Sequence, residues 1–249
     1  MKWLSVYLGT QTKESPMVDT LSKKDIAFAS LQERILKLEL APGTTLEEGP
    51  LCAEFGLSRT PMRELLQKLS GLGYTTLSAG RGATVADINL QKIRQFFQAA
   101  PLLHALIARL AAEAADSNAE QALRIAQANM NRARVSRNAA SLALADHQFH
   151  VTLCQIADNP FLGPSLERLL IEQTRMSQGF YGIKGSLGTA QIDKSLAEHE
   201  ALVDAILRKD AGLAVAIAMA HWEPVRDFIE QNMQPEPLMD EGGLLDDLS

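Results

Sequence analysis

The chain has little cysteine and no long apolar run, and each shortage excludes a class of protein. Cys52 and Cys154 are the only cysteines among 249 residues, which excludes a disulfide-stapled scaffold and fits a reducing compartment. The longest nearly uncharged apolar run, residues 211–222, is far shorter than the roughly 20 residues that span a bilayer. The first 20 residues lack a secretory signal. We therefore expect a cytoplasmic protein without a membrane segment.

Positive charge is also scarce, because 24 Lys and Arg stand against 30 Asp and Glu, for a formal net charge of -6. Residues 233–249 hold five acidic residues and no Lys or Arg, so the rest of the chain is close to neutral. We expect residues 234–249 to be a disordered acidic tail and residues 1–20 a flexible leader, in which Met17 is an alternative start. The apolar fraction of 46% excludes disorder of the whole chain.

Residues 21–87 have the pattern of a winged helix-turn-helix domain. Apolar residues at helical spacing predict helices over 24–40 and 48–55, and a third that Thr60 caps and Pro61 begins. Two β-prone segments follow, at 74–77 and 83–86, and a glycine-bracketed turn joins them. The predicted hairpin carries Arg81 at its tip.

The third predicted helix has the features of a helix that reads DNA. Its solvent-facing side chains can donate to bases and phosphates while the opposite face is apolar. A charged outer face that only keeps the helix soluble is the alternative. The order of three helices and a basic hairpin within about 65 residues favours DNA binding. The candidate DNA contacts are Arg59, Thr60, Arg63, Gln67, Arg81 and Gly82.

From residue 87 onward the β signal vanishes, and Ala, Leu and Gln dominate. The longest break between helical patterns is 179–188. We predict a mainly α protein, with the winged helix-turn-helix domain followed by an all-α bundle over residues 88–233. The helices expected in this bundle cover 90–115, 119–136, 139–157, 161–178, 190–208 and 211–233.

Three motifs in order resemble the GntR-type transcriptional regulators. They are Ala41-Pro42-Gly43, the run 51–64 and Gly80-Arg81-Gly82. In that family the positions matching Arg59, Arg63 and Gly82 meet DNA, and the resemblance implies the same here. Gly49 is a departure, because many relatives carry a side chain there, often basic, that touches the DNA backbone. A missing phosphate contact weakens affinity without changing the base preference.

The helical half contains a candidate metal site. Asp146 and His150 are four residues apart in one predicted helix, so both project from the same face and can chelate one ion. His199 and His221 each lie on an apolar stripe. An intrahelical ion pair and satisfied core histidines explain the same residues without a metal, and spacing alone leaves both interpretations open.

A second resemblance bears on whether these residues bind a metal or are ordinary core residues. The segments around Asp146, Glu198-His199 and His221 resemble the effector-binding helical domain of the FadR-like branch of these regulators. In many such domains the residues matching Asp146, His150, His199 and His221 bind a divalent metal, and the resemblance implies the same here. Three imidazoles and one carboxylate suit a transition metal such as zinc or nickel.

The first helix of the bundle departs from the family pattern. Relatives often carry an arginine and a glutamate one turn apart, where this chain has Ala100 and His104. Pro101 is also expected to disturb the helix if it lies beyond the first turn. We take His104 and Arg175 as candidate effector contacts; a surface or interdomain histidine is the alternative for His104.

The leading hypothesis is a homodimeric DNA-binding repressor. A small-molecule effector, a carboxylate bound near the metal, would control its binding to operator DNA. We do not expect an enzyme, since the HExxH pair is absent. Two alternatives remain at this point: a metal-dependent hydrolase whose winged segment is an interaction module, and an effector-independent DNA-binding protein with a structural metal.

Overall fold

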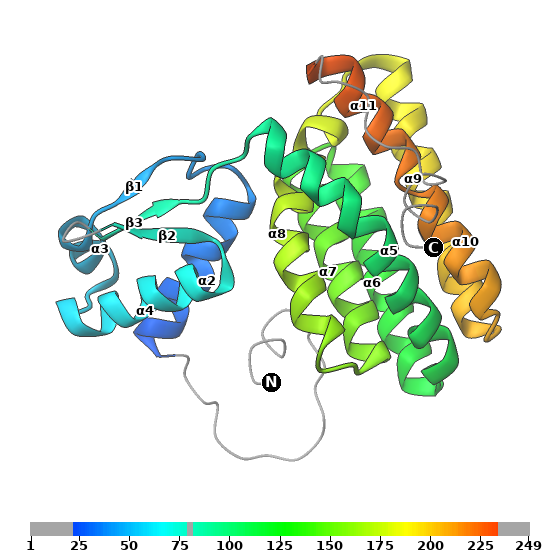
Figure 1. Cartoon of the computed structure of the whole chain (residues 1–249), viewed down its shortest axis with the longest axis horizontal. Helices are drawn as coiled ribbons and strands as arrows, with labels where there is room; N and C mark the ends of the chain where they lie inside the picture. Colours follow the sequence, from blue (N-terminus) through cyan, green and yellow to red (C-terminus); the bar gives the residue numbers. More distant parts are fainter. Residues whose placement is uncertain (1–21, 79–81, 234–249) are drawn as a thin grey trace.

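A computed structural model describes residues 22–78 and 82–233. The predicted leader, the wing-tip residue Arg81 and the predicted acidic tail lie outside these residues. The described chain forms a small α/β part, here called the winged module, beside a larger helical bundle (Figure 1). This arrangement confirms the predicted fold class.

The winged module has three helices and a small antiparallel sheet in which β3 lies between β1 and β2. The apolar faces of the helices and the inner face of the sheet share one core, which includes Leu31, Ile35, Leu65 and Leu69. The predicted helix 48–55 is confirmed. The elements are α2 Lys23–Leu36, β1 Thr45–Leu46, α3 Glu48–Phe55, α4 Arg59–Leu72, β2 Thr75–Ser78 and β3 Gly82–Val85.

Two expected helix boundaries in the module are wrong. Helix α2 ends at Leu36, short of residue 40, because Leu38 adopts a left-handed conformation with φ 58°. Helix α4 begins at Arg59 with Ser58 as N-cap, so Thr60 and Pro61 lie inside its first turn. The first four N–H groups of a helix have no intrahelical partner, and Pro61 is therefore tolerated there as well as at the first position.

Strand β1 was not predicted from the sequence, because two residues give no periodicity. Thr45 and Leu46 pair with Thr84 and Ala83 of β3. Gly82 makes this close approach feasible: it has φ 95°, and a Cβ atom built there would lie 2.2 Å from the carbonyl oxygen of Leu46. The wing therefore needs glycine at position 82 for backbone reasons, independently of any DNA contact.

The bundle contains the helices expected from the sequence, with changed ends. The prediction over 139–157 is confirmed, whereas α9 begins at Gly185 and leaves a break of only 182–184. The single helix expected over 211–233 is two helices, separated at His221 and Trp222. The helices are α5 Leu90–Ala114, α6 Ser117–Ser136, α7 Ala139–Ala157, α8 Leu162–Tyr181, α9 Gly185–Leu207, α10 Ala211–Ala220 and α11 Glu223–Met233.

Helix α5 is continuous through Pro101, contrary to the expected disturbance. A proline in a helix interior removes one intrahelical hydrogen bond and strains the preceding turn. Pro101 is buried, and its neighbours Phe97 and Ala100 pack with Trp222 in one apolar cluster. Packing of this face keeps the helix intact.

Helix α8 contacts helix α2 of the winged module (Figure 1), and Leu144 of α7 also packs against the core of the module. Ile171 of α8 belongs to the core of the module. The side chain of Gln178 donates to the carbonyl of Leu36 at the end of α2, and Arg175 donates to the carbonyl of Ala86 just after β3. Within the described residues, no helix combines the length and apolar character needed to cross a membrane.

Candidate functional site

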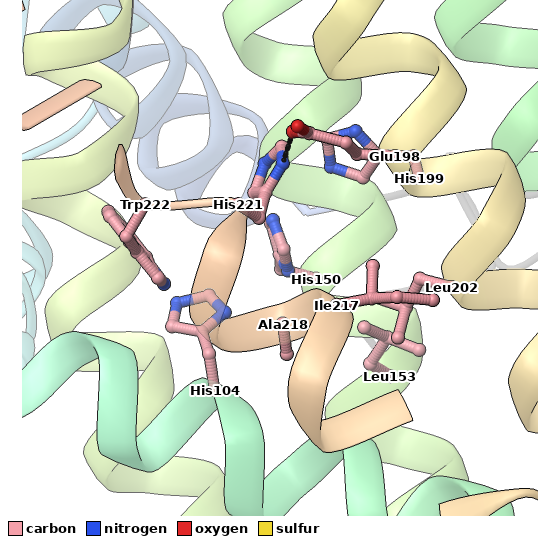
Figure 2. Close-up of a pocket in the computed structure, with 10 residues that line it drawn as sticks. All are labelled: His104, His150, Leu153, Glu198, His199, Leu202, Ile217, Ala218, His221 and Trp222. Carbon is pink, nitrogen blue, oxygen red and sulfur yellow. Dashed lines mark hydrogen bonds and ion pairs between the residues drawn. The ribbon is translucent and has the colours of Figure 1, made fainter. Parts of the chain in front are cut away.

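Four side chains from three parts of the bundle meet at one point. Asp146 and His150 lie one turn apart on α7, His199 lies on α9, and His221 follows the last residue of α10. One potential ligand atom of each residue lies within 4.8 Å of those of the others. Figure 2 shows the rings of His150, His199 and His221 converging from different elements. The sequence placed only Asp146 and His150 on one face; the fold brings in the other two.

The atoms that face the centre of this cluster lack hydrogen-bond partners. Asp146 Oδ1 lies 3.1 Å from His199 Nε2 and 3.6 Å from His150 Nε2. All three atoms are buried, and none has a hydrogen bond among the described residues. Leaving a buried polar atom unpaired costs about 1 to 3 kcal/mol. A bound cation would satisfy all of them together.

The outward-facing atoms of Asp146, His199 and His221 are hydrogen-bonded, whereas His150 Nδ1 is buried without a hydrogen bond among the described residues. His199 Nδ1 donates to the carbonyl oxygen of Ser195 over 2.7 Å, and His221 Nδ1 donates to Glu198 Oε2 over 2.7 Å. Asp146 Oδ2 accepts from Gln173 Nε2 at 3.1 Å. A ring whose Nδ1 donates in this way keeps the lone pair of Nε2 for a metal. Three of the four residues therefore match metal ligands that are held by an outer layer of hydrogen bonds.

The charge states of the cluster also suit a metal ligand set. Burial lowers the pKa of His150 and, with a contribution from His199, that of His221. Burial by itself would raise the pKa of Asp146, but attraction to His150 and the other imidazoles holds it below its usual range. Neutral imidazoles beside an ionised carboxylate are the forms that coordinate zinc or nickel.

A small cavity adjoins the cluster, and the structure places His104 in its wall. The His104 ring centroid lies 4.5 Å from that of His150 and 4.9 Å from that of Trp222 (Figure 2). His104 Nε2 and Trp222 Nε1 are both buried without a hydrogen-bond partner. The cavity has a free volume of about 10 Å³, room for about one water molecule, and its described lining includes no Lys or Arg.

Arg175 lies away from this cavity, so its position does not support the expected effector contact. Its buried guanidinium bonds Glu172 Oε2 at 2.9 Å and the carbonyl of Ala86, at the junction with the winged module. Arg175 was a candidate replacement for the arginine that many relatives carry on the first helix of this domain, where this chain has Ala100. The buried guanidinium instead links the helical bundle to the winged module through its hydrogen bond to Ala86.

Sequence reasoning missed three residues around the site. Trp222 was treated as the end of an apolar run, although the buried indole N–H shows that it needs a partner. Glu198 and Gln173 orient His221 and Asp146. Glu198 directly precedes His199 in the sequence, which is the one signal that could have drawn attention to it.

The four described side chains predicted to contact DNA, Arg59, Thr60, Arg63 and Gln67, are exposed on α4. Arg63 Nε bonds both carboxylate oxygens of Glu48 on α3, at 2.7 and 2.9 Å, and this pairing raises the pKa of Arg63. Gly49 is exposed on α3, and a Cβ built there would meet nothing within 4 Å. These residues leave one face of the module free for a duplex.

Comparisons with known proteins agree with the interpretation of both the winged module and the helical bundle. The model of the family described as "Bacterial regulatory proteins, gntR family" matches residues 23–85, and the FCD domain model matches residues 95–224. The chain is 30% identical over 230 residues to the galactonate operon transcriptional repressor of Escherichia coli, covering 80% of this chain and 93% of that one. It is 23% identical over 225 residues to the gluconate operon transcriptional repressor of Bacillus subtilis, covering 85% and 87%.

Solved structures share the fold. The E. coli McbR/YncC structure superposes with a TM-score of 0.70 at 18% identity, covering 86% of this chain and 99% of that chain. A putative GntR regulator from Rhodococcus sp. RHA1 gives 0.66 at 15% identity, covering 87% and 100%. The relatives are transcriptional regulators, and neither the hydrolase nor the effector-independent alternative finds support among them. The chain belongs to the GntR family of bacterial transcriptional regulators, with a DNA-binding winged helix-turn-helix domain and an effector-binding FCD domain.

Proposed function

We propose that this regulator is a homodimeric repressor that a small carboxylate controls through a transition metal in the helical bundle. The observation that carries the proposal is the set of buried, unpartnered ligand atoms of Asp146, His150 and His199, with His221 alongside. Asp146 Oδ1 lies within ion-pair distance of His199 Nε2 and His150 Nε2, but none of the three atoms makes a hydrogen bond, whereas buried polar atoms of a structural core normally do. A small cavity adjoins these residues, and His104 and Trp222 lie in its wall.

In this proposal Asp146, His150, His199 and His221 hold zinc or nickel. When bound, the metal supplies a positive charge that attracts an anionic effector. Ser195, Glu198 and Gln173 orient the ligand side chains through the hydrogen bonds described above. His104 and Trp222 face the adjoining cavity with unpartnered ring nitrogens and contact the rest of the effector.

The class of effector follows from this chemistry and from the relatives. Two similar repressors are named for operons of galactonate and gluconate, which are sugar acids. No Lys or Arg lines the described cavity, so the metal is the cationic partner there for a carboxylate. The free volume of about 10 Å³ is too small for a sugar acid, so binding requires the cavity walls to move apart.

The winged modules of two protomers would read a two-fold symmetric operator in the cytoplasm. The division at residues 21–87 and 88–233 separates DNA reading from effector binding. Arg59, Thr60, Arg63 and Gln67 of α4 would contact bases and phosphates in the major groove, and Arg81 and Gly82 of the wing the adjacent backbone. An effector that prefers one arrangement of the modules by about 1 to 3 kcal/mol is sufficient to switch binding.

The test is a thermal-shift screen of small carboxylic acids and sugar acids on the purified and the metal-stripped protein, with the metal content of both measured. We expect one or more acids to stabilise only the metal-loaded form and to change its affinity for operator DNA. A tightly held metal with no acid shifting either form would instead indicate a structural ion. Absence of metal after loading would overturn the metal site.

A further inference from the structure

A second cavity lies at one end of the bundle, where the α6–α7 connection meets the α8–α9 connection. Its free volume is about 520 Å³, against about 10 Å³ for the cavity beside the metal cluster. Sites for small molecules generally have about 300 to 1,000 Å³. The larger cavity therefore accommodates a metabolite without rearrangement, and nothing in the proposed function uses it.

The charge around this cavity has one sign. Arg134, Arg137 and Lys184 line it, and no Asp or Glu is among the described residues of its lining. Arg134 Nε is held at 2.6 Å by Asp193, which lies outside the lining. Arg137 and Lys184 are exposed, and no ion pair occupies either of them in the described part of the chain. Two cations without counter-charges at the mouth of one cavity attract an anion.

The rest of the lining is uncharged: Asn138 and Thr189 are polar, and the remainder of the wall is apolar. Leu142, Ile183 and Ile192 line it together with Tyr181, whose hydroxyl lies 3.4 Å from Ser195 Oγ. Tyr181 also lines a third cavity, which lies next to Asp146 and Glu198. An apolar wall opposite a cationic mouth fits a ligand that has an organic body and one anionic group.

We propose that this cavity is a second ligand site, specific for a small organic phosphate. Arg137 and Lys184 bind the phosphate group, and the apolar wall contacts the organic body. The two free cations match the double charge of a phosphate monoester better than the single charge of a carboxylate, and the guanidinium fork can bond two phosphate oxygens at once. The site is distinct from the metal centre and does not depend on the effector proposed for it.

The test uses phenyl phosphate as the probe, titrated calorimetrically into the full-length protein, with inorganic phosphate and benzoate as comparison ligands. We expect saturable binding of phenyl phosphate that is tighter than that of either comparison ligand. The double variant Arg137→Gln, Lys184→Gln should weaken this binding at least tenfold. The matched control is Arg132→Gln, which removes an exposed arginine of α6 outside the lining and should leave the affinity within twofold.

A second variant tests the cavity without altering its charge. Thr189 is exposed at the lining, and Thr189→Trp should fill the space and abolish phenyl phosphate binding while metal content and thermal unfolding stay unchanged. The proposal is overturned by an absence of saturable binding up to about 10 mM, or by equal binding in the double variant. Tighter binding of benzoate than of phenyl phosphate would overturn the phosphate assignment.

Discussion

The winged module and the helical bundle place their functional side chains in opposite environments. Arg59, Thr60 and Arg63 are exposed on α4, whereas Asp146 and His199 are 1% and 2% exposed inside the bundle. An exposed charge keeps its hydration in the free protein, but a buried one depends on partners that the fold or a ligand must supply. Substitutions of the exposed α4 residues should therefore alter DNA binding alone. Substitutions of the buried residues in the bundle should alter ligand binding and also the stability of the fold.

Metal removal should give the largest effect and would test this contrast directly. A ligand that binds only the folded state stabilises it by about 3 to 4 kcal/mol when free metal exceeds its Kd by about 100- to 1,000-fold. We expect chelation, or the variant His199→Ala, to lower the free energy of unfolding accordingly. Thermal unfolding with and without chelator, together with metal analysis, measures this loss of stability. Equal unfolding temperatures in both conditions would contradict the prediction.

Gly82→Ala should break the contrast, because Gly82 is a predicted DNA contact that also determines the stability of the wing. The added Cβ would lie 2.2 Å from the carbonyl oxygen of Leu46, at a residue with φ 95°. We expect a loss of about 1 to 3 kcal/mol, measured by denaturant unfolding. Gly49→Ala is the matched control, since a Cβ there meets nothing within 4 Å and the residue lies in α3. A control as unstable as the variant would refute the steric explanation.

Arg63→Ala should weaken operator binding and leave stability unchanged. An arginine that contacts a base contributes about 5- to 150-fold in affinity. Fluorescence anisotropy on an operator, repeated over a range of salt concentrations, measures the loss and the change in the salt dependence. Arg109→Ala removes an arginine that is exposed on α5 and pairs with Glu113, and it should leave DNA affinity unchanged. An equal loss in both variants would indicate a general charge effect.

Substitutions of helix caps should have the smallest effect. They compare the winged module with the bundle and leave the DNA-contact residues and the metal cluster unchanged. Asp116 caps α6 by accepting a hydrogen bond from the Ala119 N–H at 2.8 Å, whereas Ser58 at the start of α4 makes no side-chain cap bond. Asp116→Ala should cost about 1 kcal/mol, and Ser58→Ala only a few tenths. Chemical denaturation of both variants decides whether the assigned caps are correct.

Amphipathic periodicity was sufficient to predict much of the fold. The helices over 48–55 and 139–157 have the bounds read from the sequence, since both are bracketed by clear start and stop residues. The break between α10 and α11 was missed because the apolar pattern continues across it. Pro224, in the first turn of α11, was the signal for that break, since a proline removes an N–H that a continuous helix would use.

The two functional regions differ in how far sequence could describe them. The exposed face of α4 follows from residue spacing along one helix, and its side chains lie as expected. The cluster around Asp146 needs residues from α7, α9 and the end of α10, and single-sequence periodicity carries no information on such tertiary contacts. The family resemblance supplied that grouping. For Arg175 the sequence could not show that the guanidinium lies against Glu172 and Ala86, because both contacts depend on tertiary structure.

The contacts of helix α8 with both the metal cluster and the winged module have a thermodynamic consequence. Gln173 of this helix bonds Asp146 of the candidate metal cluster, and Arg175, two positions further along, bonds the carbonyl of Ala86 at the edge of the winged module. The two positions are about 3 Å apart along one rigid axis. Any linkage that passes through this helix is reciprocal. Operator DNA that fixes the modules must then change the affinity of the bundle for its ligands by the same factor by which those ligands change the affinity for DNA.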